Sequence, residues 1–372
     1  MNIESRVRAA LAAAIAEGMV PGAVCEVSVG GVAIGPITVG SLGTVDECGE
    51  AIPLEKYEPA RADTAYDIAS VTKLFSAVTV LRLVDARALD LDCPIGQWLG
   101  AYRVDAKQRV TLRHLLTHTS GLPDTWDGWH AYVDDEGTPD ARWRTRNRAA
   151  VLGSIVGLSL ANPTGSTYEY SCLGYITAMA CAEAATGRGW ESLVREQVID
   201  PLRLEHTGFG PVTAAAPTEY EPQIGRGLVQ GVVHDETAFA LEDVSANAGL
   251  FSTAGDLRLF GESMADGFDQ LLTKESSREF WTDQLPDVLG PGTPPEWGQG
   301  IGPRIGQETL MTAGLRSARG HAGFTGPCVI VDRERRLVIA LVTNRVHPSR
   351  HASDGSVLRR RVSRAVLDAL GD

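Results

Sequence analysis

Ser70 and Lys73 lie three residues apart, where a turn gives way to a long apolar pattern. On a helix, side chains at this spacing are neighbours with Cβ atoms about 5–6 Å apart, so a hydroxyl and an amine could share a proton. The helix dipole and burial would both lower the pKa of Lys73, which would suit it as the base that activates Ser70. The unpaired N–H of Ser70 could also stabilise an oxyanion. Alternatively, Ser70 only caps the helix and Lys73 lies on its surface.

Two further segments could complete this chemistry. Tyr170 precedes a predicted helix that begins near Gly174, and a phenol there could relay a proton. Alternatively, Tyr170 is an aromatic side chain that only packs the loop. His321-Ala322-Gly323 is predicted to stand at the head of a strand, where the two small residues would let a substrate backbone approach closely. Taken alone, that segment is a turn.

Composition excludes several classes of function. The chain has 372 residues, 44% hydrophobic and 22% charged, which is typical of a globular protein with one or two domains. A net charge of -13 argues against nucleic acid as a partner. The six cysteines form no C-x-x-C pair, which favours reduced thiols over disulfides or a zinc site.

The hydrophobic patterning argues against a membrane protein. No run of about 18 apolar residues occurs, so no membrane span is predicted. Charged residues interrupt the apolar residues of the first 22 positions, which does not fit a secretory leader. We therefore expect a cytoplasmic protein.

The two ends of the chain resemble each other in their predicted elements. A helix over 3–17 precedes a hairpin around Gly30-Gly31, and a hairpin over 327–344 precedes a helix to the C-terminus. Residues 70–200 are mostly helical in pattern. We predict an α+β fold with an antiparallel sheet flanked by helices. Its α/β domain comprises residues 1–66 and 225–372, residues 67–224 form an inserted helical domain, and the active site lies in the cleft between them.

Together, in this order and spacing, the three segments resemble the serine hydrolases of the class C β-lactamase and penicillin-binding-protein fold, with their carboxylesterase and transacylase branches. The family's motifs are S-x-x-K, Y-x-N and K-T-G or its H-x-G variant, and the matching segments here are residues 70–73, 170–172 and 321–323. The resemblance spans nearly the whole chain. Further similar stretches are residues 111–124, 194–210, 246–257 and 320–347.

The resemblance implies an acyl-enzyme mechanism. Ser70 would attack an acyl carbonyl while Lys73 and Tyr170 move protons, with His321 in the third motif. The N–H of Phe324 would be the second oxyanion donor. No cofactor or metal is implied. The partners would be a small-molecule acyl donor and, for a transacylase, an amine or alcohol acceptor, and the sequence gives no oligomeric state.

Two departures from the family's motifs bear on the substrate. Cys172 replaces the asparagine of Y-x-N, so the amide that helps hold a β-lactam side chain is missing. His321 replaces the lysine of K-T-G and is mostly neutral at pH 7, because the reference pKa of histidine is about 6.5. Both departures favour an esterase or acyltransferase. The alternatives are a β-lactamase or D-alanyl-D-alanine peptidase, and a catalytically silent binding protein of the same fold.

Other candidate residues have simpler readings. Substrate-binding roles are predicted for Cys172, Gly323 and Trp126, although Trp126 could equally pack its loop. Cys172 could also be a rival nucleophile, but no histidine lies beside it in the sequence. His114 and His118 could be drawn as a metal pair, yet no third ligand accompanies them, so we interpret them as structural. Acceptor specificity is expected to lie in the loops around 122–145 and 285–320.

Overall fold

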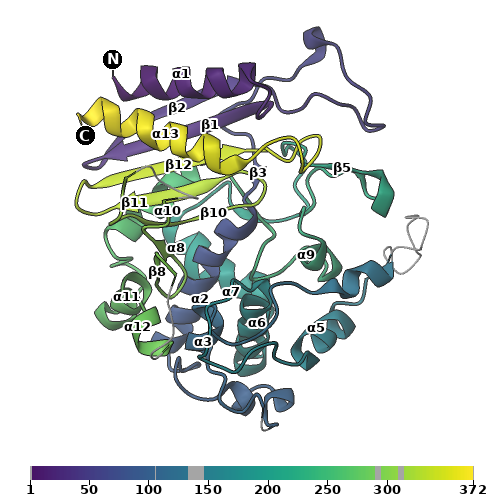
Figure 1. The fold of residues 1–372 in the computed structure, drawn as a ribbon, viewed down its shortest axis with the longest axis vertical. Helices are drawn as coiled ribbons and strands as arrows, with labels where there is room; N and C mark the ends of the chain where they lie inside the picture. Colours follow the sequence, from purple (N-terminus) through teal and green to yellow (C-terminus); the bar gives the residue numbers. More distant parts are fainter. Residues whose placement is uncertain (1, 105, 133–145, 290–294, 309–313, 372) are drawn as a thin grey trace.

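A seven-stranded sheet joins the two ends of the chain in the computed structural model, which describes residues 2–104, 106–132, 146–289, 295–308 and 314–371. The strand order is β2-β1-β12-β11-β10-β9-β8, and neighbouring strands pair antiparallel (Figure 1). The strands are β1 (Gly22–Val29), β2 (Val32–Gly40), β8 (Gly298–Gln299), β9 (Arg304–Ile305), β10 (Arg319–Ala322), β11 (Cys328–Asp332) and β12 (Leu337–Thr343).

Both predicted hairpins are confirmed. Gly30 and Gly31 turn from β1 into β2 with φ of 61° and 86°, a conformation that glycine adopts without steric cost. The charged turn after Asp332 connects β11 to β12. The two hairpins lie side by side because β1 pairs with β12, with Cys25 opposite Leu341.

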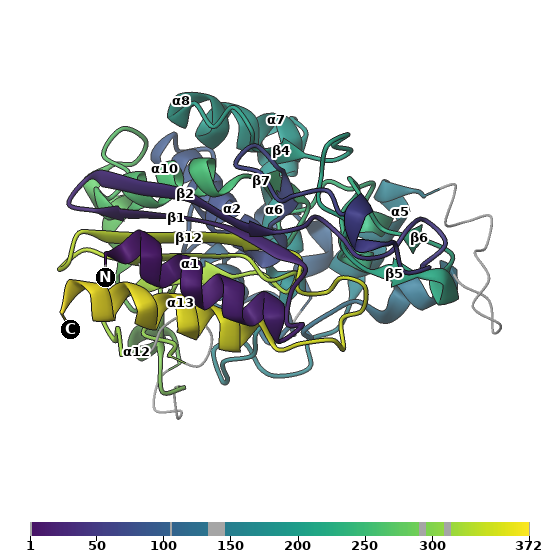
Figure 2. The same ribbon diagram turned by 90° about the horizontal axis from the view of Figure 1, so that it is seen from above.

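Helices cover both faces of this sheet. α1 (Ile3–Ala16) and α13 (Gly355–Leu370) lie side by side over one face, and α10 (Ala254–Ala265) covers the other (Figure 2). Successive residues of a strand point to opposite faces, so Ile330 joins the core under α1 and α13 while Val329 and Val331 join the core under α10. Burial on both faces explains why β11 and β12 are almost uninterrupted apolar runs.

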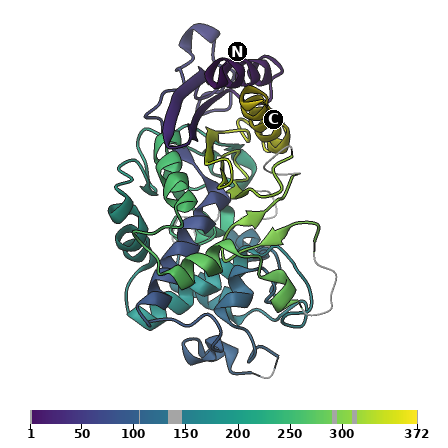
Figure 3. The ribbon, with the colours of Figure 1, turned by 90° about the vertical axis from the view of Figure 1, so that its left-hand side faces the viewer.

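The remaining helices pack on the α10 side of the sheet (Figure 3). At their centre is α2 (Thr72–Asp85), whose side chains are buried on nearly every side. Phe75 of α2 stacks on Phe260 of α10 at 4.1 Å between ring centroids, which fixes α2 to the sheet layer. The other α-helices among the described residues are α3 (Leu112–Leu116), α5 (Arg148–Gly157), α6 (Cys172–Thr186), α7 (Trp190–Val194), α8 (Asp200–Leu202), α9 (Glu236–Ala240), α11 (Lys274–Trp281) and α12 (Leu285–Val288).

The described residues also form two small sheets. β3 (Tyr66–Asp67) and β4 (Gly208–Phe209) both pair with β7 (Leu250–Ser252), and β5 (Tyr220–Glu221) pairs with β6 (Gly227–Leu228). The α+β class with an antiparallel sheet and flanking helices is confirmed. The predicted domain boundaries stay a prediction.

One local prediction is wrong. His321-Ala322-Gly323 does not open a strand, because His321 and Ala322 end β10 and Gly323 follows it. His321 pairs with Val329 of β11. A strand of four residues is too short to show an alternating pattern, so the sequence signal came from the longer strand that follows.

Among the described residues, no helix is long and apolar enough to cross a membrane. The cytoplasmic location stays a prediction.

Two helical glycines should respond oppositely to alanine. A Cβ at Gly261 in α10 would lie 2.4 Å from Cγ1 of Val338, whereas a Cβ at the exposed Gly153 in α5 would meet nothing within 4 Å. Gly153→Ala should raise the free energy of unfolding by about 0.5–1 kcal/mol through helix propensity. Gly261→Ala should lower it by about 1–3 kcal/mol through overpacking. Urea denaturation measures both, and equal stabilisation by the two changes would contradict the packing of α10 on β12.

Candidate active site

The turn that carries Ser70 is held by the buried carboxylate of Asp67. One Asp67 oxygen accepts the N–H of Ala69 at 2.7 Å, and the other accepts the N–H of His234 at 2.7 Å. Ala69 has φ of 44°, a left-handed conformation that costs free energy for a residue with a Cβ. Sequence reasoning missed Asp67, although a carboxylate three residues before a candidate nucleophile was a usable signal.

Lys73 is fully buried with three polar neighbours around its amine. Its Nζ lies 2.9 Å from Oγ of Ser70, 3.0 Å from the carbonyl oxygen of Asn247 and 3.4 Å from Sγ of Cys172. An ammonium can donate to all three. A neutral amine can donate to two of them and accept the Ser70 hydroxyl proton. Lys73 therefore has hydrogen-bond partners as an ammonium and as an amine, and only the direction of its hydrogen bond with Ser70 differs between the two forms.

The direction of the Lys73 pKa differs from the sequence expectation. Burial acts to lower it, as expected, but the negative charges that Cys172 and Tyr170 carry when ionised outweigh burial and raise the Lys73 pKa above its ordinary value. These partners come from a distant segment, so the local sequence did not show them. The direction of the Lys73 pKa is therefore set by these ionisable partners and not by burial alone.

Tyr170 lies among four nitrogen-bearing side chains. The Arg304 guanidinium lies 4.4 Å from the centre of its ring and the Lys73 amine 5.1 Å. The rings of His118 and His321 lie 4.6 Å and 6.1 Å from it, measured between centroids. Sequence reasoning missed Arg304, which belongs to no motif and reaches the site because β9 pairs with the His321 strand.

Both histidines beside Tyr170 are held neutral. Burial, with the charges of Arg304 and Lys73, lowers the pKa of His118 and of His321 well below the ordinary range. Nδ1 of His118 accepts the N–H of Ser171, which places the proton of the neutral ring on Nε2. Nδ1 of His321 lies 2.9 Å from the carbonyl oxygen of Ala322, so it donates and leaves Nε2 as an acceptor. His321 therefore does not supply the positive charge of the K-T-G lysine.

The two expected oxyanion donors border one cavity. In the described ranges, neither the N–H of Ser70 nor that of Phe324 donates to a protein acceptor. A Cβ at Gly323 would lie 2.5 Å from the carbonyl oxygen of Ile68. Glycine is needed there because the chain's own backbone comes close, and the expected approach of a substrate backbone stays a prediction.

This cavity has a volume of about 420 Å³, a size typical of small-molecule sites. Three guanidinium groups and one carboxylate line it. Its lining residues are Ser70, Tyr170, Arg304, Ala322, Gly323, Phe324, Arg345, Ser353, Asp354, Gly355 and Arg359.

Two predicted substrate-binding residues lie away from this lining. Trp126 is 7% exposed, donates to Oγ of Ser154 at 2.9 Å and packs in the helical core, which is the loop-packing alternative. Cys172 contacts Lys73 but is not among the residues that line the cavity. Of the loops expected to set acceptor specificity, residues 133–145, 290–294 and 309–313 lie outside the described residues.

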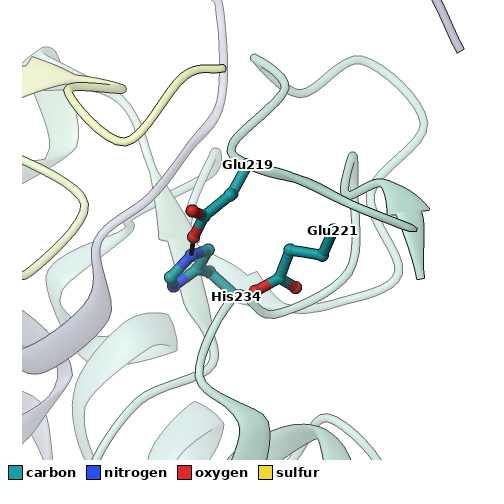
Figure 4. A group of neighbouring side chains, drawn as sticks. All are labelled: Glu219, Glu221 and His234. Carbon is teal, nitrogen blue, oxygen red and sulfur yellow. Dashed lines mark hydrogen bonds and ion pairs between the residues drawn. The ribbon is translucent and has the colours of Figure 1, made fainter. Parts of the chain in front are cut away.

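A second polar cluster includes His234, whose backbone N–H donates to Asp67. Glu219, Glu221 and His234 place potential ligand atoms within 4.8 Å of one another (Figure 4). However, Nε of Arg350 lies 2.6 Å from Glu219, and its Nη2 lies 2.5 Å from Glu221. Arg226 also pairs with Glu221. The guanidinium groups supply the positive charge that a metal would bring, so we interpret the cluster as an ion-pair network.

Glu219 should make stability depend on acid pH. Burial would raise its pKa, but hydrogen bonds from His234 and Arg350 outweigh burial and lower it to about 2. A lowered carboxyl pKa contributes stability that is complete above the unfolded pKa of about 4.3 and is lost as pH falls toward 2, on the order of 2–3 kcal/mol. Urea denaturation between pH 5 and 2.5 should therefore show a shallower loss for Glu219→Gln than for the unmodified protein. The exposed control Glu55→Gln should follow the unmodified protein, and identical slopes for all three would contradict the assignment.

The comparisons with known proteins agree with this geometry. The family model "Beta-lactamase" matches residues 7–363. An N-acetylmuramyl-L-alanine amidase of Bacillus subtilis (strain 168) is 27% identical over 311 residues, covering 76% of this chain and 68% of the relative. A putative D-alanyl-D-alanine carboxypeptidase of Escherichia coli (strain K12) is 26% identical over 338 residues, covering 82% and 74%.

Solved structures share the fold. EstCE1, described as a hydrolase with promiscuous acyltransferase activity, superposes with a TM-score of 0.73 at 19% identity, over 98% of each chain. Simvastatin synthase LovD from Aspergillus terreus, in a mutant form, gives a TM-score of 0.69 at 19% identity, over 98% of this chain and 95% of that one. At these identities the likeness concerns the fold alone.

Proposed function

Because the chain belongs to the Beta-lactamase family, we propose that it is a serine-dependent hydrolase or acyltransferase that acts on esters through an acyl-enzyme on Ser70. The observation that carries the proposal is the 2.9 Å contact between Nζ of Lys73 and Oγ of Ser70 at the edge of the 420 Å³ cavity. A hydroxyl with a buried amine beside it is the arrangement that nucleophilic catalysis needs.

In the proposed mechanism, Lys73 reacts as the neutral amine: Oγ of Ser70 attacks the acyl carbonyl and its proton passes to Nζ of Lys73, which passes one on through Tyr170. The N–H groups of Ser70 and Phe324 stabilise the oxygen that becomes negative. Tyr170 delivers the proton to the leaving group, and the acyl group stays on Ser70. Water then releases it as an acid, or an amine or alcohol in the cavity accepts it.

The preference for esters rests on two side chains. Cys172 supplies a weakly hydrogen-bonding thiol where the Y-x-N motif has an amide, and it contacts Lys73. His321 is neutral, so it offers no charge to the carboxylate of a β-lactam. Cleavage of an ester with a good leaving group needs less stabilisation from such contacts than cleavage of an amide does.

The arginines support a second candidate, a peptidase or amidase whose substrate carries a carboxylate on the leaving group. Arg304, Arg345 and Arg359 line the cavity against the single carboxylate of Asp354. Nε of Arg304 is buried without a protein acceptor in the described ranges, and its guanidinium lies over Tyr170, where the leaving group must be protonated. A terminal carboxylate there would be paired.

Intact mass spectrometry after exposure to activated esters, thioesters, penicillins and peptides ending in D-alanyl-D-alanine tests the proposal. We expect an acyl adduct with esters and thioesters that Ser70→Ala abolishes and Cys172→Ala retains at least in part, because only the first change removes the attacking atom. Lys73→Met should reduce adduct formation nearly as much as Ser70→Ala, since residues that act as one unit are not additive.

An adduct mapped to Cys172 would contradict the proposed nucleophile. Faster turnover on addition of amines or alcohols, with a new amide or ester as product, would identify a transferase. Efficient cleavage of the D-alanyl-D-alanine peptides, selectively weakened by Arg304→Gln, would favour the second candidate over the ester preference. Efficient penicillin hydrolysis would overturn both candidates.

A further inference from the structure

Phe324 is a large apolar side chain left exposed beside the nucleophile. It lines the same cavity as Ser70 and is 49% exposed. Single exposed apolar residues are common on protein surfaces, so exposure alone indicates nothing. What distinguishes Phe324 is its position in the cavity and how firmly its backbone is held.

Three hydrogen bonds hold the loop at Phe324 and Thr325. The carbonyl oxygen of Phe324 accepts Nε of Arg345 at 2.7 Å, and the backbone N–H of Arg345 donates to the carbonyl oxygen of Thr325 at 2.8 Å. The hydroxyl of Thr325 donates to the carbonyl oxygen of Asp67 at 2.7 Å. The ring is therefore presented from a backbone that is also tied to the Ser70 turn.

The ring itself packs against flat polar groups. The Arg345 guanidinium lies 4.5 Å from the ring centre, and the His234 ring lies nearly parallel to it at 5.7 Å between centroids. These contacts restrict the orientation of the ring while half of the residue stays exposed. A ligand that packs on a side chain already ordered in this way loses little further conformational entropy on binding.

The mechanism separates the two halves of the substrate. Tyr170 and Arg304 lie together, and the leaving group must lie within reach of Tyr170 to receive its proton. Phe324, Arg345 and Gly355, which starts α13, also line the cavity, and none of them is among the ring and cation contacts of Tyr170 in the described structure. With the leaving group at Tyr170, the acyl group is assigned to their side of the cavity.

We propose that Phe324 forms an acyl subsite that selects aromatic acyl groups, an inference that rests on the proposed function. Two aromatic rings attract each other edge to face or offset beyond the effect of buried area, which an aliphatic ring of similar size does not reproduce. The subsite therefore distinguishes a flat aromatic ring from a saturated ring of the same size.

Vinyl esters of phenylacetic, cyclohexylacetic and butyric acid test the subsite, because they share one leaving group. For the unmodified protein we expect kcat/KM for the phenylacetyl ester to exceed that for the cyclohexylacetyl ester by about two- to tenfold. Phe324→Leu should bring this ratio close to one, and Phe324→Tyr should keep it. The butyryl ester reports any general loss of activity that either change causes through the oxyanion loop.

Leu259→Ala is the matched control, since Leu259 is 39% exposed on α10 and does not line the cavity, so the ratio should stay unchanged. A ratio near one in the unmodified protein, or a ratio that survives Phe324→Leu, would overturn the subsite even where acyl-enzyme forms. Absence of acyl-enzyme from all three esters would instead overturn the proposed function, and the subsite with it.

Discussion

The buried amine of Lys73 must find partners in both of its protonation states, and much of the structure serves that requirement. An unpaired buried ammonium costs several kcal/mol, which would unfold a marginally stable domain or expel the side chain. Three separate segments supply the acceptors: Ser70 from the turn before α2, Cys172 from the start of α6 and Asn247 from the segment before β7. The packing of α2 on α6 and on the sheet layer therefore also assembles the site.

Positive charge dominates the cavity, although the chain as a whole is strongly acidic. Arg304, Arg345 and Arg359 line it, while His118 and His321 are kept neutral by burial and by the neighbouring cations. Because both imidazoles are neutral, the positive charges next to Tyr170 are those of Lys73 and Arg304. A substrate that brings negative charge, in its ground state or as an oxyanion, enters a site already arranged for it.

The sequence was informative where the signal is local. Gly30-Gly31 and the charged turn before Leu337 identified both hairpins, and the spacing of Ser70 and Lys73 identified their contact. It was uninformative where the cause is tertiary. Arg304 reaches Tyr170 only because β9 pairs with β10, Trp126 packs inward because Ser154 offers an acceptor, and the pKa of Lys73 depends on residues about a hundred positions away.

The arrangement of the site depends above all on the protonation of Lys73, which can be measured. The chain has four lysines, Lys56, Lys73, Lys107 and Lys274, so a titration followed by NMR of labelled lysine side chains can be assigned by single substitutions. We predict that Lys73 stays charged to a higher pH than an ordinary lysine, and that Tyr170→Phe and Cys172→Ala each lower the Lys73 pKa by removing a group that is negative when ionised. A Lys73 pKa below the ordinary value in the unmodified protein, unchanged in both variants, would contradict the coupling of Lys73 to Tyr170 and Cys172.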